Sequence, residues 1–215
     1  MSRKNIILAV FAIILFLILA FFIKADQLYG FESWVYAEAT EHMSDFLTAI
    51  LIFITNIGGP IGVMCVCAII YIIPKLRNRV AIPVSIAVVS SLVLNTILKA
   101  IFARERPNIL RLVSENYYSF PSGHAMVNMA LYSILMMYAY NFVKNKKIRY
   151  TIYVVLTSLI LIIGFTRIYL GVHYAGDIIG GWLMGFAVSL IVYMIMKKST
   201  ITNYKNKKEE KQNNF

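Results

Sequence analysis

Residues Thr166 to Met196 read TRIYLGVHYAGDIIGGWLMGFAVSLIVYMIM, and the second half of this stretch decides the fold. From Ile178 to Met196 the sequence holds nineteen consecutive residues without a charged side chain. At a rise of about 1.5 Å per residue, a helix of this length covers most of the roughly 30 Å hydrocarbon core of a bilayer. The stretch therefore predicts a membrane-spanning helix, preceded by a short segment that carries an arginine, a histidine and an aspartate.

Five further apolar runs of this kind precede Ile178–Met196 in the sequence. One of them is interrupted by Gly58, Gly59 and Pro60, which predicts a kink within one span, because neither half is long enough to cross alone. With 60% hydrophobic and 14% charged residues, the chain is predicted to be an all-α integral membrane bundle of six transmembrane helices. The five runs are Ile6–Ile23, Phe46–Ile73, Val80–Leu98, Ala125–Val143 and Tyr150–Thr166.

The basic residues that flank these runs predict the orientation of the bundle. They gather at Arg3–Lys4, Lys75–Arg79, Lys144–Arg149 and Lys197–Lys198, which lie on alternate connections. Positive charge marks the cytoplasmic side of a membrane protein, so both termini are expected in the cytoplasm. A net charge of +11 would suggest nucleic acid as the partner of a soluble domain, but here its distribution indicates a bilayer, and no nucleic-acid partner is expected.

This topology divides the chain into two parts. Residues 1–198 are expected to form a single six-helix membrane domain. Residues 199–215 are polar and rich in lysine, a composition that favours a disordered cytoplasmic tail able to touch anionic lipid.

The segment between Lys99 and Ser122 is basic although the topology places it outside. Lys99 and Arg106 are seven residues apart, about two helical turns, so both cations can project from one helix face near the outer surface. Pro107 predicts that the helix ends there. Each cation alone fits snorkelling towards lipid headgroups, but a bound anion explains the excess of positive charge on this face better.

Two more groups of residues are predicted at the same face. Ser122, Gly123 and His124 stand at the start of a predicted helix, where unpaired N–H groups and the helix dipole favour an anion, although ordinary capping also accounts for them. His173 and Asp177 are four residues apart, which places them on one face of a helix. The carboxylate can then bind one ring nitrogen and leave the other basic, as a nucleophile or base requires.

These residues together indicate a phosphate site with a nucleophile and an acid. They resemble the signatures of the type-2 phosphatidic acid phosphatases, also called lipid phosphate phosphatases, in order, in spacing and in the six-span frame. The one departure is Thr166, where the family usually has serine. The signatures are Lys-x6-Arg-Pro at Lys99–Pro107, Pro-Ser-Gly-His at Pro121–His124 and Ser-Arg-x5-His-x3-Asp at Thr166–Asp177.

The resemblance implies a role for each matched residue. His173 is the expected nucleophile, which forms a phosphohistidine, Asp177 orients it, and His124 protonates the leaving lipid oxygen. No metal or other cofactor is expected, and no cluster of acidic residues suited to Mg²⁺ accompanies the motifs. The residues expected to hold the phosphoryl oxygens are Lys99, Arg106, Ser122, Gly123 and Arg167.

The expected function is that of a lipid phosphatase of the bacterial plasma membrane whose active site faces away from the cytoplasm. Its substrate is a phosphate monoester or terminal pyrophosphate of a membrane lipid. The resemblance implies undecaprenyl diphosphate or phosphatidylglycerophosphate first and phosphatidic acid behind them. Two alternatives stay open: a lipid-linked phosphotransferase that uses the same site, and a lipid transporter without catalysis.

The sequence leaves the role of one segment open. Gln27–Ser44 mixes aromatic and acidic residues, which suits either an exposed loop at headgroup level or a short helix that lines a lipid entrance. The oligomeric state is likewise not indicated by any pattern in the sequence.

Overall fold

The structure, a computed structural model, describes residues 3–108 and 111–213. Within these residues the only regular elements are helices, which confirms the predicted all-α class. The helices are α1 (Arg3–Lys24), α2 (Tyr29–Thr40), α3 (Asp45–Ile57), α4 (Pro60–Ile72), α5 (Pro74–Leu76), the π-helical turn η1 (Arg77–Ala81), α6 (Ile82–Phe102), α7 (Gly123–Phe142), α8 (Lys146–Tyr169) and α9 (Ala175–Asn213).

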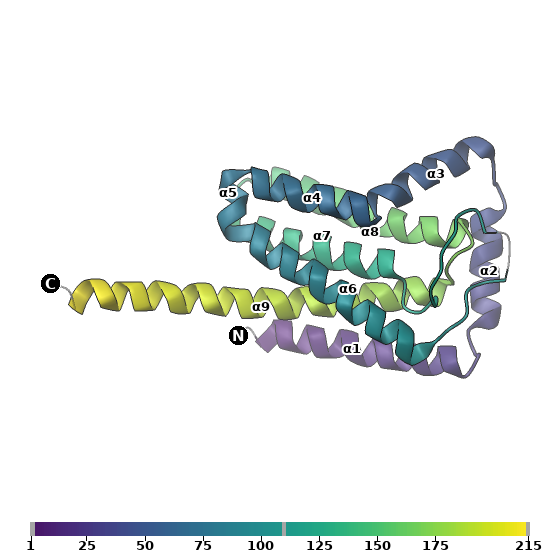
Figure 1. Cartoon of the computed structure of the whole chain (residues 1–215), viewed down its shortest axis with the longest axis horizontal. Coiled ribbons are helices and arrows are strands. Elements are labelled where there is room, and N and C mark those ends of the chain that lie inside the picture. The colour runs from purple at the N-terminus through teal and green to yellow at the C-terminus, as the bar shows by residue number, and fades with distance from the viewer. Residues whose placement is uncertain (1–2, 109–110, 214–215) are drawn as a thin grey trace.

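The long helices run back and forth between two ends of one bundle (Figure 1). The start of α1, the α5 corner and the far half of α9 lie towards one end. The helix α2, the connection between α6 and α7, and the turn between α8 and α9 lie at the other end. All the residues predicted for the site therefore come from one end of the bundle.

In the described part of the chain, four helical segments are long and apolar enough to cross a membrane: α1, Arg79–Phe102, α8 and Ala175–Lys197. The pair α3 and α4 makes a fifth if it is counted as one span, bent by 50° at the glycines and proline that predicted the kink. Many large apolar side chains on these helices are exposed, which suits contact with lipid. The six-span arrangement stays a prediction, because α7 is not among the segments that meet this criterion in the described part of the chain.

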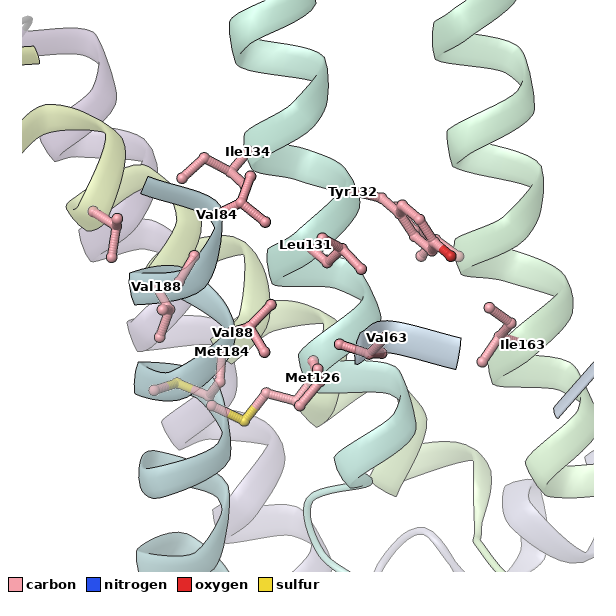
Figure 2. Close-up of a cluster of buried hydrophobic side chains, with 14 of the residues drawn as sticks. Val63, Val84, Val88, Met126, Leu131, Tyr132, Ile134, Ile163, Met184 and Val188 are labelled. Atoms are coloured by element: carbon pink, nitrogen blue, oxygen red, sulfur yellow. The ribbon is translucent and has the colours of Figure 1, made fainter. Parts of the chain in front are cut away.

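The helix α7 lies inside the bundle. It packs against α6, α8 and α9, and the side chains along its first half are almost entirely buried. Figure 2 shows Met126 and Leu131 of this helix among Val88 of α6 and Met184 of α9. A helix surrounded by protein needs no continuous lipid-facing surface.

Close contact between α7 and α9 fixes the position of the site. The small residues Gly181 and Gly185 on α9 admit the backbone of α7, since an added Cβ would lie 2.7 Å from the carbonyl oxygen of Ser122 and 2.2 Å from that of Met126. Small residues at a helix contact allow the two backbones to approach this closely. The start of α7 is held directly against the first turns of α9.

Two helix ends differ from the sequence prediction. The helix α6 ends at Phe102 rather than near Pro107, because Ala103 adopts a left-handed conformation with φ of 45°, and its N–H bonds to the carbonyl of Lys99. Arg106 therefore lies on a connection and does not share a helix face with Lys99. The helix α9 continues to Asn213, so residues 199–213, expected to be disordered, are helical; they contain no glycine or proline that would stop a helix.

Candidate active site

A cavity of about 510 Å³ opens at the end of the bundle that carries the predicted motifs. Five predicted residues line it, whereas Ser122, Arg167 and Asp177 are buried behind its wall. The complete described lining is Asn95, Thr96, Lys99, Ala100, Arg106, Glu115, Tyr117, Tyr118, Gly123, His124 and His173. Both histidines and two of the three predicted cations thus surround one space.

The predicted pair of His173 and Asp177 forms, but by a geometry that the sequence analysis did not foresee. His173 lies two residues before α9, and Asp177 lies in the first turn of that helix, so they do not share a helix face. The Asp177 side chain turns back: its Oδ2 lies 3.3 Å from Nδ1 of His173 and accepts the N–H of Tyr174 at 2.9 Å. With Nδ1 bound to this carboxylate, Nε2 of His173 is the nitrogen left to act on a ligand in the cavity.

The surroundings of His173 keep its ring neutral. Burial lowers the pKa of His173 well below its usual range, and the positive charges of Arg167, Arg106 and Lys99 lower it further. A neutral imidazole whose Nδ1 proton is donated to Asp177 has a lone pair on Nε2. That lone pair faces Arg106, whose NH1 lies 3.3 Å away.

The carbonyl groups of the connection bring Lys99 and Arg106 together. Nζ of Lys99 donates to the carbonyls of Tyr118 and Ser119. The guanidinium of Arg106 donates to the carbonyls of Tyr117 and, at 2.8 Å, Val172. The two cations converge because the chain folds back after α6, and not because they share a helix face.

The start of α7 has the predicted arrangement. Ser122 caps the helix, with its Oγ accepting the N–H of Ala125 at 3.5 Å, and its own N–H donates to the carbonyl of Asp177 at 3.0 Å. Gly123 lies where a Cβ would approach Oδ1 of Asn95 to 3.1 Å. Its N–H belongs to the helix start, where intrahelical partners are lacking. Gly123 lines the cavity beside His124. A direct contact of Ser122 with phosphate stays a prediction.

Arg167 reaches the cavity through another side chain. It is 2% exposed, NH1 donates to Oγ1 of Thr55 at 2.8 Å, and NH2 pairs with Glu115. The other carboxylate oxygen of Glu115 lies 3.6 Å from NH2 of Arg106. Glu115 therefore bridges two of the cations predicted to hold phosphate.

Sequence analysis missed Glu115, Thr55, Arg104 and Glu32. Arg104 pairs with Asp177 at 2.7 Å and with Glu32 of α2 at 2.6 Å. The signal for Arg104 was present in the basic excess of its segment, and the signal for Glu32 in the acidic residues of Gln27–Ser44. Their partners lie 73 and 72 residues away along the chain, and nothing in a single sequence indicates such pairs.

The segment Gln27–Ser44 contains a helix, so its interpretation as an exposed loop is wrong. The helix α2 packs Val35, Tyr36 and Ala39 against the cluster that includes Ala175 and Ile178 of α9. It contributes no residue to the described lining of the cavity. The interpretation as a lipid entrance stays a prediction that this lining does not support.

Membrane-crossing helices that carry cations, two histidines and a helix N-terminus to one cavity form the kind of site found in membrane enzymes that handle phosphate. The family model of the PAP2 superfamily matches residues 80–201, and the chain belongs to this superfamily. The family resemblance given by the three motifs is confirmed.

Two relatives of known name support the membership. Phosphatidylglycerophosphatase B of Bacillus subtilis (strain 168) is 35% identical over 103 residues, which are 46% of this chain and 49% of that protein. The match thus spans about half the length of that relative. Undecaprenyl-diphosphatase of Sulfolobus acidocaldarius is 26% identical over 200 residues, covering 85% of this chain and 88% of that protein.

Two solved structures share the fold. The first transmembrane PAP2-type phosphatidylglycerolphosphate phosphatase from Bacillus subtilis superposes with a TM-score of 0.80 at 25% identity, over 88% of this chain and 96% of that chain. LpxE of Aquifex aeolicus superposes with a TM-score of 0.62 at 22% identity, over 74% and 92% of the two chains. With its apolar helices, this chain is a multi-pass membrane protein.

Proposed function

We propose that the chain is a lipid phosphate phosphatase that acts through a phosphohistidine on His173. The observation that carries the proposal is the cavity in which His173, held by Asp177, faces Arg106 beside Lys99 and His124. The names of the relatives support a phosphatase, and they make undecaprenyl diphosphate and phosphatidylglycerophosphate the first candidate substrates. Phosphatidic acid is the third candidate.

The geometry supports a two-step reaction. Nε2 of His173 attacks phosphorus, the bond to the lipid oxygen breaks, and His124 gives that oxygen its proton. Water then attacks the phosphohistidine with His124 accepting a proton, which releases inorganic phosphate and restores His173. Asp177 keeps the Nδ1 proton in place during both steps. Because charge moves onto the equatorial oxygens, the fixed cations and the N–H groups at the start of α7 stabilise the transition state.

Substrate binding prepares the nucleophile in this scheme. Without a ligand, Arg106 directs an N–H at Nε2 of His173 and pairs with Glu115. A phosphoryl oxygen that binds Arg106 in place of His173 and Glu115 draws the guanidinium away from Nε2 of His173. The lone pair of Nε2 is then free. Lys99, Ser122, Gly123 and Arg167 complete the proposed set of phosphate ligands.

We further propose six membrane spans with both termini in the cytoplasm of a bacterial cell and the site at the outer face of its plasma membrane. The start of α1 and the α5 corner lie at the end of the bundle opposite the site (Figure 1). The basic clusters Arg3–Lys4 and Lys75–Arg79 fall on these elements. The positive-inside rule then places the cavity outside.

Release of inorganic phosphate by the purified protein in detergent tests the proposal. Undecaprenyl diphosphate, phosphatidylglycerophosphate and phosphatidic acid are assayed in parallel with EDTA present. We expect release from at least one lipid by the wild type, and none from the His173→Ala variant although that variant still binds the lipid. No release by the wild type overturns the phosphatase and favours transport. A phosphorylated acceptor lipid in place of free phosphate identifies a phosphotransferase.

A further inference from the structure

We propose that Glu32 and Arg104 are a positioning pair that holds the carboxylate of Asp177 in the orientation in which it aligns His173. On this inference, which rests on the proposed phosphatase, α2 belongs to the catalytic centre although it does not line the cavity. Neither residue belongs to the described lining of the cavity, so both act through Asp177.

The hydrogen bonds assign each oxygen of Asp177 to a different side. Oδ1 accepts from NH1 of Arg104 at 2.7 Å. Oδ2 faces Nδ1 of His173 at 3.3 Å and accepts the N–H of Tyr174 at 2.9 Å. Rotation of the carboxylate breaks the contact with Arg104, so the bond on Oδ1 fixes the direction of Oδ2.

Arg104 is itself fixed on three sides. Its NH1 and NH2 donate to the two carboxylate oxygens of Glu32 at 3.1 and 2.6 Å, a two-pronged contact that suits only a guanidinium. Its guanidinium carbon lies 4.1 Å from the ring centroid of Tyr174. The left-handed Ala103 turns the chain so that the next residue points at Asp177, and such a conformation persists where the surrounding contacts enforce it.

Glu32 has a place built for it at the start of α9. Its Oε1 accepts the N–H of Gly176 at 3.2 Å. A Cβ at Gly176 would lie 2.6 Å from that same oxygen, so the glycine is what admits the carboxylate. The side chains of Glu32 and Asp177 are 2% and 0% exposed, against 17% for Arg104. Charges buried this deeply are retained only when they are paired.

The charge of the triad explains why a second carboxylate is needed. Burial alone would lower the pKa of Arg104, but its hydrogen bonds to Glu32 and the negative charge of Asp177 raise it instead, so the guanidinium remains charged. Arg104 with Asp177 alone would be a neutral pair. With Glu32 the group keeps one net negative charge behind Nδ1 of His173, which stabilises the ring when Nε2 becomes bonded to phosphorus.

Three variants of the full chain in detergent test the inference: Glu32→Gln, Arg104→Gln and Arg104→Lys. The matched controls are Glu38→Gln, on the exposed side of α2, and Arg111→Gln, an exposed arginine on the same connection as Arg104. Phosphate release is measured with whichever of the three lipids the wild type hydrolyses. Binding of sodium orthovanadate, which accepts five ligands as phosphorus does in the transition state, gives a readout that does not depend on turnover.

We expect kcat to fall about 10- to 100-fold in Glu32→Gln and Arg104→Gln, by analogy with the range seen when the partner that orients a metal-binding histidine is lost. KM should stay within about twofold, since neither residue contacts the lipid, and vanadate binding should weaken in parallel with kcat. Arg104→Lys keeps the charge but cannot bond both carboxylates as a fork, so its kcat should lie between that of Arg104→Gln and that of the wild type. Both controls should match the wild type.

The pH profile separates positioning from general damage. The charged groups around His173 are Lys99 of α6, Arg106 of the connection, Arg167 of α8 and Asp177, with His124 of α7 also facing the cavity; none of them is changed. Loss of a negative charge in Glu32→Gln should lower the pKa of His173 and move the acid limb of kcat/KM to lower pH. Loss of a positive charge in Arg104→Gln should move this limb to higher pH.

Several results would overturn the inference. If the wild type hydrolyses lipid and the Glu32→Gln and Arg104→Lys variants have an unchanged kcat, the positioning role of the pair is refuted. The proposed phosphatase activity is not affected by that result. Acid limbs that move in the same direction in the two glutamine variants indicate a structural role only. If Arg104→Gln does not elute as a folded protein, Glu32→Gln and Arg104→Lys still decide the matter. Failure of the proposed function is distinguishable, because it shows as an inactive wild type.

Discussion

Replacement of Asp177 by asparagine tests how much of the rate depends on the orientation of His173. In the wild type, the two carboxylate oxygens accept from Arg104, from the N–H of Tyr174 and from His173. An asparagine has one oxygen and one NH₂ group. Its NH₂ group must therefore face either Arg104 or His173 in place of a carboxylate oxygen. The bond to Arg104 is the shortest of the contacts and the side chain is fully buried, so the amide oxygen should keep Arg104, and His173 should lose its acceptor.

The magnitude follows from that lost contact. A hydrogen bond to a charged group contributes about 1.5–3 kcal/mol, and each 1.4 kcal/mol is about tenfold in rate. We therefore expect kcat to fall roughly 10- to 150-fold in Asp177→Asn without being abolished, since the nucleophile itself remains. The assay is steady-state phosphate release over a range of lipid concentrations, with folding checked by size-exclusion chromatography.

Two outcomes would refute this reasoning. A kcat within twofold of the wild type would mean that Asp177 only caps α9 through the N–H of Tyr174. A complete loss, equal to that of His173→Ala, would mean that the carboxylate takes part in the chemistry and does more than orient the ring. Only an intermediate rate with KM unchanged supports the role as an orienting group.

Two further substitutions test the electrostatics and the packing of the site. Glu115→Gln removes the carboxylate that substrate must displace from Arg106 and Arg167. For an interaction of about 0.5–1.5 kcal/mol, KM should fall roughly 2- to 10-fold. An unchanged or higher KM in the lipid titration would show that Glu115 does not compete with phosphate. Gly185→Val places a Cβ 2.2 Å from the carbonyl oxygen of Met126 and should destabilise the protein by about 1–3 kcal/mol or more. The control Gly30→Ala has open space around its Cβ and should keep the wild-type Tm. Equal Tm values of the two variants in detergent would contradict the close contact of α7 with α9.

Local patterns were enough to predict which residues gather at the site. Long uncharged runs predict membrane helices, because every backbone polar group of a span must be hydrogen-bonded within the protein. The alternation of the six runs then brings Lys99, His124 and His173 to one end of the bundle, with no knowledge of their contacts. The kink at Gly58–Pro60 was predictable for the same reason, because a break in helix geometry is a local property.

The wrong helix ends also have a local cause. Pro107 predicts the end of α6, but Ala103 ends the helix four residues earlier by adopting a left-handed conformation, which glycine adopts more readily. The spacing of His173 and Asp177 predicted a contact that exists, although it arises from a side chain turned back over the start of α9. Both errors come from reading helical spacing where the chain has already left the helix.

The residues that sequence analysis missed are the ones that balance the charge of the site. Three cations of the motifs, Lys99, Arg106 and Arg167, would repel one another in an apolar environment without counter-charges, and burial raises the cost further. Glu115 pairs with two of them, and Glu32 and Asp177 enclose a fourth cation, Arg104.

The described network thus holds four cations against three carboxylates and is close to neutral before substrate binds. On the proposed function, a phosphate dianion that displaces Glu115 balances the positive charges of the site. On the proposed function, the counter-charges stabilise the empty site, and its excess of positive charge attracts the phosphate of the substrate.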